Sequence, residues 1–432
     1  MQRKLTGAVG VGLVGLIAMV AACGSSDSGD TGKCTPENAA GSPGEPQPGP
    51  GDGGNGGQGA SGNSDDGGAG SGTGGDGNQP TGSVPATPAS FTPSNLPDDF
   101  ELEVDGDFII NGETCGEDVE LDTDTGEISC SSNGTPVYAF QIVEQADGSE
   151  VGVFAGKNIL IAPNVTVTVV GQRPLVLLAP GNVQLNGTIN AIADSIRNDR
   201  GTAGGFSGPQ GEQVKGQGPG GGSGTSTEAG GGAFCGKGGK GGGDMGAAGG
   251  VAYGNAELAP LIGGSSGGNG ALGGVGGAGG GAVQVIAGGK LTLAATGIIH
   301  VGGAGGGWNG GGGGSGGAIL LEADELIVAG TLAANGGGGG EGDAVAGARG
   351  LNASPDAVPA PSGHGSTETD DDGGDGSAAD VVDGSPGGAL SGGGGGGAGR
   401  IRLNSKSGEA QVTGVLSPAA DSACVSEGTL GS

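Results

Sequence analysis

A short apolar strand pattern that repeats around glycine limits the fold of this chain more than any other feature. Two copies are adjacent in residues 281–335, as GGGAVQVIAGGKLTLAATGIIHV and GGAILLEADELIVAGTLAAN, and fainter copies occupy 173–191 and 399–417. Apolar residues alternate with polar or small ones, and glycines interrupt the runs, which is typical of short, half-buried β-strands. Aligned on these strands, the copies share three apolar columns and one glycine column. The columns are Leu175, Val283, Ile319 and Ile401; Leu177, Val285, Leu321 and Leu403; Ile189, Ile299, Leu332 and Leu416; and Gly187, Gly297, Gly330 and Gly414.

The repeats predict the fold class. One copy cannot bury its own apolar face, whereas stacked copies build a continuous core. We therefore expect an all-β protein in which residues 149–418 form a right-handed parallel β-helix or a closely related β-solenoid. A β-sandwich is the alternative, because short strands separated by turn residues also suit that fold.

Three glycine-rich insertions interrupt the repeats, at 198–280, 302–317 and 336–398. They leave the strands at similar points in successive copies, so we expect them to project on one side. Glycine supplies 115 of the 432 residues, and its GGxGG runs are compatible with two states. The runs are disordered, or they pack as extended threefold helices that hydrogen-bond to one another where only glycine fits. The proline- and aspartate-containing stretch 353–386 is expected to be a flexible acidic loop.

The N-terminus has the features of an export signal. Arg3 and Lys4 precede an apolar run that is too short and too rich in glycine for a stable membrane span. The run ends in VAAC at 20–23, which is similar to a bacterial lipobox. We predict a lipoprotein signal peptide at 1–22 and acylation of Cys23, which would anchor the chain to the lipid bilayer. Gly24 after the cysteine favours the outer membrane or cell surface.

Composition divides the rest of the chain. Residues 23–96 contain almost no apolar residue, and they are predicted to be a disordered Gly/Ser/Pro/Asp tether. Residues 97–148 read as a small β module, with a hairpin turn at Asn111-Gly112. Residues 419–432 form a C-terminal tail.

The cysteines predict disulfides rather than a metal site. In an exported protein, Cys115 and Cys130 are plausible partners, and Cys235–Cys424 is a second pair to consider. Cys34 is then left over. No cysteine spacing in the sequence is that of a zinc site.

Glycine richness also produces nucleotide-binding and nucleophile motifs by chance. Residues 231–238 (GGAFCGKG) approach a P-loop, but Gly238 stands where Ser or Thr would hold magnesium. Residues 263–267 and 313–317 match a nucleophile elbow, which would still need a base. His300 is expected in a strand and His364 in the acidic loop, so neither is assigned that role.

Calcium is the one cofactor that the sequence suggests, although none is required. Asp122, Asp124 and Glu127 resemble the start of an EF-hand loop that lacks its helices and closing Glu. Residues 339–343 approach the calcium-binding β-roll repeat, but the Asp falls one place early and the unit does not recur. A solvated acidic turn is the simpler interpretation of both.

A polysaccharide-cleaving site would need clustered carboxylates and cations on one face of the stacked strands. Arg400 and Arg402 share a strand face, and Glu322 and Asp324 lie in a neighbouring copy. A surface salt bridge between copies is the preferred interpretation. Trp308 stands alone within glycine, as a packing or loop-tip residue.

Three stretches together resemble a known group of proteins. VVGQRPLVLLAPGNVQLNGTINA, GGGGGSGGAILLEADELIVAGTLAANGGGGGEG and GGGGGGAGRIRLNS are similar to the glycine-rich exported lipoproteins of myxobacteria and their relatives, over residues 99–418. The resemblance implies a surface location and this repeat layout. It implies no activity and no catalytic residues.

The formal net charge of −31 disfavours nucleic acid as a partner, because little here could neutralise phosphates. We therefore expect a surface-displayed lipoprotein with a structural or adhesive role in the cell envelope or extracellular matrix, and no catalysis. Its partners would be the bilayer, through Cys23, and an envelope or matrix protein or glycan. The alternatives are a carbohydrate-active β-helix enzyme and a calcium-stabilised binding module.

Overall fold

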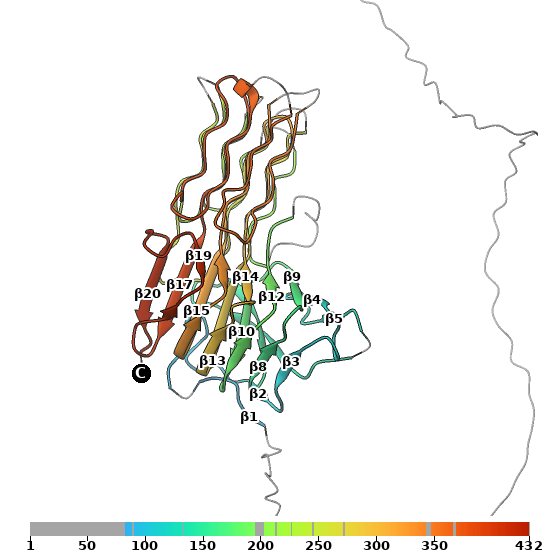
Figure 1. The fold of residues 1–432 in the computed structure, drawn as a ribbon, viewed down its shortest axis with the longest axis vertical. Coiled ribbons are helices and arrows are strands. Elements are labelled where there is room, and N and C mark those ends of the chain that lie inside the picture. The colour runs from blue at the N-terminus through green and yellow to red at the C-terminus, as the bar shows by residue number, and fades with distance from the viewer. Residues whose placement is uncertain are drawn as a thin grey trace, which may run out of the picture. The chain divides into compact units, whose positions relative to one another are not determined.

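The computed structural model describes residues 83–431, except for 89, 133, 195–202, 212–213, 226, 244–245, 271–272, 343–346 and 366–368. The predicted signal peptide, Cys23, Cys34 and most of the predicted tether lie outside the described residues. The described part is all-β, and its one helical element is the 3-10 turn η1 (Thr369–Asp371). Two mostly parallel sheets lie below a bundle of extended glycine-rich segments (Figure 1).

The larger sheet has 11 strands and the smaller has seven. The main path of the large sheet runs β20 (Val425–Thr429), β17 (Arg400–Ser405), β15 (Ala318–Val328), β13 (Ala282–Leu293), β10 (Leu175–Ala179), β7 (Glu150–Ala155) and β6 (Ala139–Glu144), and its side members are β3 (Phe108–Ile110), β8 (Ile159–Ile161), β11 (Val183–Leu185) and β18 (Gln411–Val412). The small sheet runs β19 (Val415–Ser417), β16 (Thr331–Ala333), β14 (Ile298–His300), β12 (Thr188–Asn190), β9 (Thr166–Val170), β4 (Asp118–Asp122) and β5 (Ile128–Cys130). A separate pair joins β1 (Val84–Pro85) to β2 (Glu103–Val104).

The register of the sheets matches the apolar columns predicted from the sequence. Val283 on β13 is the register partner of both Leu175 and Ile319, and the parallel column continues to Ile401 on β17. In the small sheet, Ile299 likewise lies between Ile189 and Leu332. These columns belong to one buried apolar cluster. The repeats therefore stack in parallel, strand on equivalent strand, whereas the immunoglobulin-type sandwich is antiparallel.

The glycine column lies where successive copies approach most closely. A Cβ added to Gly330 would meet the carbonyl oxygen of Gly297, and a Cβ added to Gly414 would meet that of Gly330. Any other residue would push the copies apart at this turn. The column therefore keeps the spacing between copies constant.

Residues 83–104 form a strap across the outer face of the large sheet. Phe91, Leu96 and Phe100 are buried there, in a second apolar cluster that includes Val176 and Leu320 of the sheet. The predicted tether boundary at residue 96 is therefore too late, because the chain is packed from about residue 83. The strap, together with Phe234, Leu258 and Leu261, thus buries the outer face of the central strands of the large sheet.

Residues 97–148 are not a separate module. β3 pairs with β8 and β4 pairs with β9, both in parallel, so they continue the two sheets. The predicted hairpin at Asn111-Gly112 is wrong, because β3 and β4 lie in different sheets. The hairpin instead joins β4 to β5, and β6 lies antiparallel on β7 at the end of the large sheet. The described part of the predicted C-terminal tail, 419–431, likewise belongs to the fold, since it includes β20, which pairs with β17.

The described residues contain two disulfides, and both are pairs that the sequence suggested. Cys115–Cys130 links the start of the β4–β5 hairpin to its end. Cys235–Cys424 joins the glycine-rich segment around 235 to the residue before β20, with a Cα–Cα distance of 5.6 Å. The second bond fixes the C-terminal strand to the bundle.

The glycine-rich insertions are ordered as extended segments that bond to one another. In residues 334–342, successive backbone amides donate to three different neighbouring segments, and the pattern repeats every third residue. The bonds are Gly337 N to Gly314 O (2.9 Å), Gly338 N to Leu351 O (3.0 Å), Gly339 N to Gly374 O (2.8 Å) and Gly340 N to Gly311 O (2.8 Å). This threefold period is that of a polyproline II helix, which has no internal hydrogen bonds.

The carbonyls of the same segment accept from three further neighbours. The bonds are Gly396 N to Gly337 O, Gly306 N to Gly338 O and Gly363 N to Gly339 O, each 2.8 Å. Residues 334–342 are thus surrounded on all sides by backbone. Residues 310–317 and 391–399 are enclosed in the same way. We call this assembly the glycine bundle.

The bundle also contains most of the stretch predicted to be a flexible acidic loop. Ala360, Ser377 and Ala378 are buried, and residues 372–378 bond to 360–363 and 393–396. The prediction failed because it weighed charge and proline, whereas the backbone of this stretch supplies hydrogen bonds that the central segment needs. Within the described parts of 353–386, the backbone is thus tied into the bundle, while side chains such as Val358 and Val381 remain exposed.

A substitution inside the bundle tests this packing. A Cβ on Gly337 would overlap the carbonyl of Ala304, whereas nothing lies within 4 Å of a Cβ on Gly112. We expect Gly337→Ala to lower the free energy of unfolding by about 1–3 kcal/mol, because a neighbouring backbone must move. Gly112→Ala is the control and should change it by less than about 1 kcal/mol. Equal effects in chemical denaturation would contradict the close packing.

Candidate functional site

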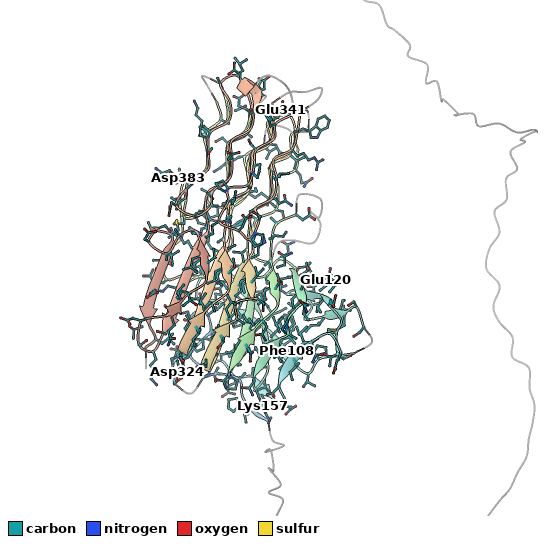
Figure 2. The ribbon with its side chains drawn as sticks, in the orientation of Figure 1. Phe108, Glu120, Lys157, Asp324, Glu341 and Asp383 are labelled. Atoms are coloured by element: carbon teal, nitrogen blue, oxygen red, sulfur yellow. A yellow bond between two sulfur atoms is a disulfide. The ribbon has the colours of Figure 1, made fainter. Side chains whose placement is uncertain are left out.

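The outer surface of the glycine bundle carries side chains that are exposed for contact with other molecules. The enclosed segments leave little room for side chains, so most of the larger residues of the insertions lie at the margins, as the sticks in Figure 2 show around Asp383. Several of these residues are large, apolar and exposed: Val214, Val251, Val275, Trp308, Leu351, Val358, Val381 and Leu390. Of these, sequence reasoning singled out only Trp308.

The two nucleophile-elbow serines hold glycine segments together. The Ser265 hydroxyl accepts a bond from Gly220 N (3.0 Å) and donates to the Tyr253 hydroxyl (3.0 Å). The Ser315 hydroxyl accepts from Ser265 N (2.9 Å). Both serines are fully buried. Residues 231–238 are likewise part of the bundle and lead into no helix among the described residues, so the P-loop interpretation has no structural context here.

The two histidines lie in different environments. His364 is exposed, and its Nδ1 lies 2.7 Å from Asp372, which raises the pKa of the imidazole. His300 ends β14 and is buried, and its Nε2 has no hydrogen-bond partner among the described residues. Burial lowers the pKa of His300 to about 4, although the charge of Asp356 opposes the shift. Neither imidazole is hydrogen-bonded to an elbow serine.

The calcium candidates form the turn between β4 and β5. Asp122 Oδ1 accepts from the amides of Asp124 and Thr125, and Asp124 accepts from Arg173 Nη1 at 2.8 Å. Arg173 also pairs with Glu150, whose hydrogen bond is the main cause that raises the arginine pKa. Protein donors therefore already engage Asp122 Oδ1 and both carboxylate oxygens of Asp124. Glu127 takes part in the turn through its backbone, and its amide donates to Thr125 Oγ1.

No other metal site emerges. Within the part of the chain that the structure describes, no group of three or more His, Cys, Asp or Glu residues could hold a metal ion. In the β-roll-like stretch 339–343, Asp343 lies outside the described residues. Glu341 there is buried, and its Oε2 accepts from Ala348 N and Gly365 N.

The expected salt bridge between copies is not formed by the residues proposed for it. Arg400 donates to the Tyr253 carbonyl (2.9 Å) and lies over the Phe234 ring, while Arg402 donates to Asn404 and to the Glu427 carbonyl. Both arginines therefore bind neutral oxygens instead of the carboxylates of Glu322 and Asp324. Asp324 instead lies 3.9 Å from Lys406.

Glu322 is a buried carboxylate that holds the strap. It is fully buried on the outer face of the large sheet. Its Oε1 accepts from Ser94 Oγ (2.7 Å) and Asn404 Nδ2 (3.0 Å), and its Oε2 accepts from Ser94 N (3.1 Å) and Gln284 Nε2 (2.7 Å). Sequence reasoning missed this role because Ser94 lies in a stretch that looked like a tether.

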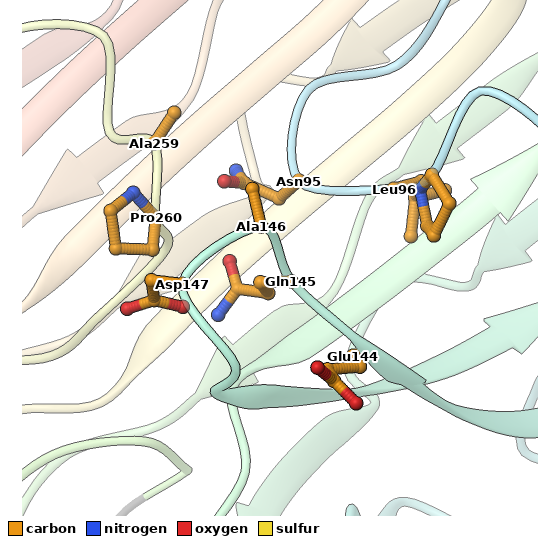
Figure 3. A pocket seen from close by; sticks show the side chains of 9 residues that line it. Asn95, Leu96, Glu144, Gln145, Ala146, Asp147, Ala259 and Pro260 are labelled. Atoms are coloured by element: carbon orange, nitrogen blue, oxygen red, sulfur yellow. The ribbon is translucent and has the colours of Figure 1, made fainter.

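Two pockets flank the turn between β6 and β7. The first has a volume of about 670 Å³ and is lined by 95–97, 144–147 and 259–260 (Figure 3). The second, of about 390 Å³, includes Arg173, Phe206 and Leu261. Gln145 is part of the wall of both.

No family model, curated protein or solved structure matches this chain at a significant level. Among the described residues, no helix is long and apolar enough to cross a bilayer.

The buried His300 predicts a pH dependence of stability. Its folded pKa of about 4 lies below the usual 6.5, so its stabilising effect is complete above pH 6.5 and is lost as the pH falls towards 4. The loss should amount to about 3 kcal/mol. We expect His300→Gln to show a shallower fall in melting temperature between pH 7 and pH 4 than the parent chain. Parallel curves would contradict a neutral, buried imidazole.

The contact between Ser94 and Glu322 predicts a second change in stability. Ser94→Ala removes one donor from a buried carboxylate and should cost about 1–3 kcal/mol. Ser90→Ala on the same strap is the matched control, because Ser90 makes only a 3.4 Å bond to Gly288 O. Urea denaturation compares the two variants, and an equal loss in both would show that Glu322 does not depend on Ser94.

Proposed function

We propose that this chain is a lipid-anchored, surface-displayed lipoprotein with a structural or adhesive role in the cell envelope or extracellular matrix, and that it catalyses no reaction. The observation that carries the proposal is the glycine bundle. Its interior is mostly backbone, with a few buried side chains such as Ser265, Ser315 and Glu341, so most of its larger side chains lie at its surface. A body of this kind is suited to holding contact residues away from an anchor.

The position of the strap supports the same role. The strap begins at the end of the sheets that lies opposite the bundle, next to β1 (Figure 1). An anchor that precedes residue 83 would therefore be attached to the body at the end opposite the free turns of the bundle. The exposed Trp308, Leu351 and Leu390 would then face outward for contact.

The architecture that we propose for the repeats is a right-handed β-solenoid. In-register parallel pairing of equivalent residues supports it. So does the route of the chain, which passes from the large sheet to the small sheet in each copy and, between β12 and β17, returns each time through the bundle. In such a stack each copy needs its neighbours to bury its apolar residues.

An adhesion assay tests the proposed role. Beads coated with the full chain should bind isolated envelope or matrix fractions of the producing cell. The triple variant Trp308→Ser, Leu351→Ser and Leu390→Ser should bind about tenfold less, since exposed anchors of this kind dominate contacts. The control is Val137→Ser with Val415→Ser, two exposed apolar residues outside the bundle. No binding by the parent chain, or equal loss in both variants, would overturn the adhesive role.

A labelling experiment tests the anchor. In the producing cell, the chain should incorporate an alkyne-bearing fatty acid and partition into the detergent phase. Cys23→Ser should remove both properties, because it removes the thiol that receives the lipid. A parent chain that takes up no label and stays in the aqueous phase would contradict the lipid anchor.

A further inference from the structure

The larger pocket has three walls that come from distant parts of the chain. The strap supplies 95–97, the β6–β7 turn supplies 144–147, and the segment before residue 261 supplies Ala259 and Pro260. Figure 3 shows Gln145 and Asp147 between the strap and Pro260. A volume of about 670 Å³ is within the range of small-molecule sites.

Two amide side chains fix these walls. Gln145 Nε2 donates to Leu261 O (3.1 Å), and Gln145 Oε1 accepts from Leu261 N (2.8 Å). Asn95 Nδ2 donates to Leu258 O (3.0 Å) and to Gln284 Oε1 (3.2 Å). The turn and the strap are therefore both tied to the 258–261 segment. A pocket whose walls are held in place in this way loses little entropy when it binds.

The lining combines apolar surface with negative charge. Leu96, Pro97, Ala146 and Pro260 supply apolar surface, and Glu144 and Asp147 supply carboxylates, while no described cation lines the pocket. The hydroxyl and amide of Ser149 bond to Asp147 and lower the pKa of its carboxyl. Asp147 therefore stays charged as the pH falls below the usual range of an aspartate.

We propose that this pocket binds a protonated amine, carried either on an alkyl stem, as in a polyamine or a lysine-like side chain, or on a sugar ring, as in an amino sugar. The amine lies between Glu144 and Asp147, and the stem lies against Leu96 and Pro260. The site is separate from the outer surface of the glycine bundle, so it goes beyond the adhesive role. A metal ion is the poorer fit, because two carboxylates supply too few ligands for calcium.

Titration of the purified full chain with defined amines, followed by calorimetry or by NMR of the ligand, tests the proposal. The probes are 1,6-diaminohexane and glucosamine, and their neutral controls are 1,6-hexanediol and N-acetylglucosamine. Saturable binding of either amine, with no binding of its neutral control, is expected. The amine that binds more tightly identifies the alkyl or the sugar class. No saturable binding of either amine would overturn the proposal.

Three variants show whether the amine binds in this pocket. Glu144→Gln with Asp147→Asn should weaken binding by about tenfold, since two exposed ion pairs are lost. The amide oxygen introduced at position 147 can still accept from Ser149, so the turn should keep its shape. Ala146→Arg should abolish binding by placing a cation in the pocket. Glu409→Gln, an exposed carboxylate outside the pocket, is the control. Equal weakening by Glu409→Gln would show diffuse attraction to the acidic surface and would overturn the site.

Discussion

Hydrogen bonds between the backbones of neighbouring glycine segments are the interaction on which this structure depends. A polyproline II segment cannot satisfy its own amides and carbonyls, so each must find a partner elsewhere. The threefold period directs three successive amides and three successive carbonyls outward in different directions, and in 334–342 all of these directions are used. This arrangement brings backbones so close that a Cβ on Gly337 would overlap a carbonyl. Glycine is therefore required by contact distance, and the interior contains almost no apolar side chains.

The sheets solve the main difficulty of such a bundle, which is the entropy of aligning long glycine segments. Residues 301–307 follow β14 and 334–342 follow β16, so two strands that pair in the small sheet lead into two segments that bond to each other. Residues 310–317 and 391–399 precede β15 and β17 in the same way. The stacked strands thus set the spacing of the bundle, and the apolar core between the sheets stabilises both.

Apolar side chains hold the sheets together, whereas backbone hydrogen bonds hold the bundle, so the sequence pattern predicted the strands better than the state of the glycine runs. The columns through Val283 and Ile299 were readable because alternation of apolar residues directly reports a strand face. The glycine runs allowed two states, because hydrogen bonds between segments leave no apolar pattern. The hairpin turn predicted at Asn111-Gly112 was wrong because β3 and β4, which are close in sequence, lie in different sheets. The pocket at Gln145 has no local signal, since its walls are far apart along the chain.

The strap shows how one buried charge can organise a surface that otherwise looks apolar. Glu322 lies among Leu320 and other buried residues of the large sheet, where an unpaired carboxylate would be costly. Four donors remove that cost, and two of them come from Ser94. If the strap detached, the carboxylate would lose half of its donors, and Phe91 and Leu96 would be exposed at the same time. Polar and apolar contacts therefore fail together, which makes attachment of the strap cooperative. A pull on the chain before residue 83 would accordingly be resisted by the whole outer face of the sheet rather than by the β1–β2 pair alone.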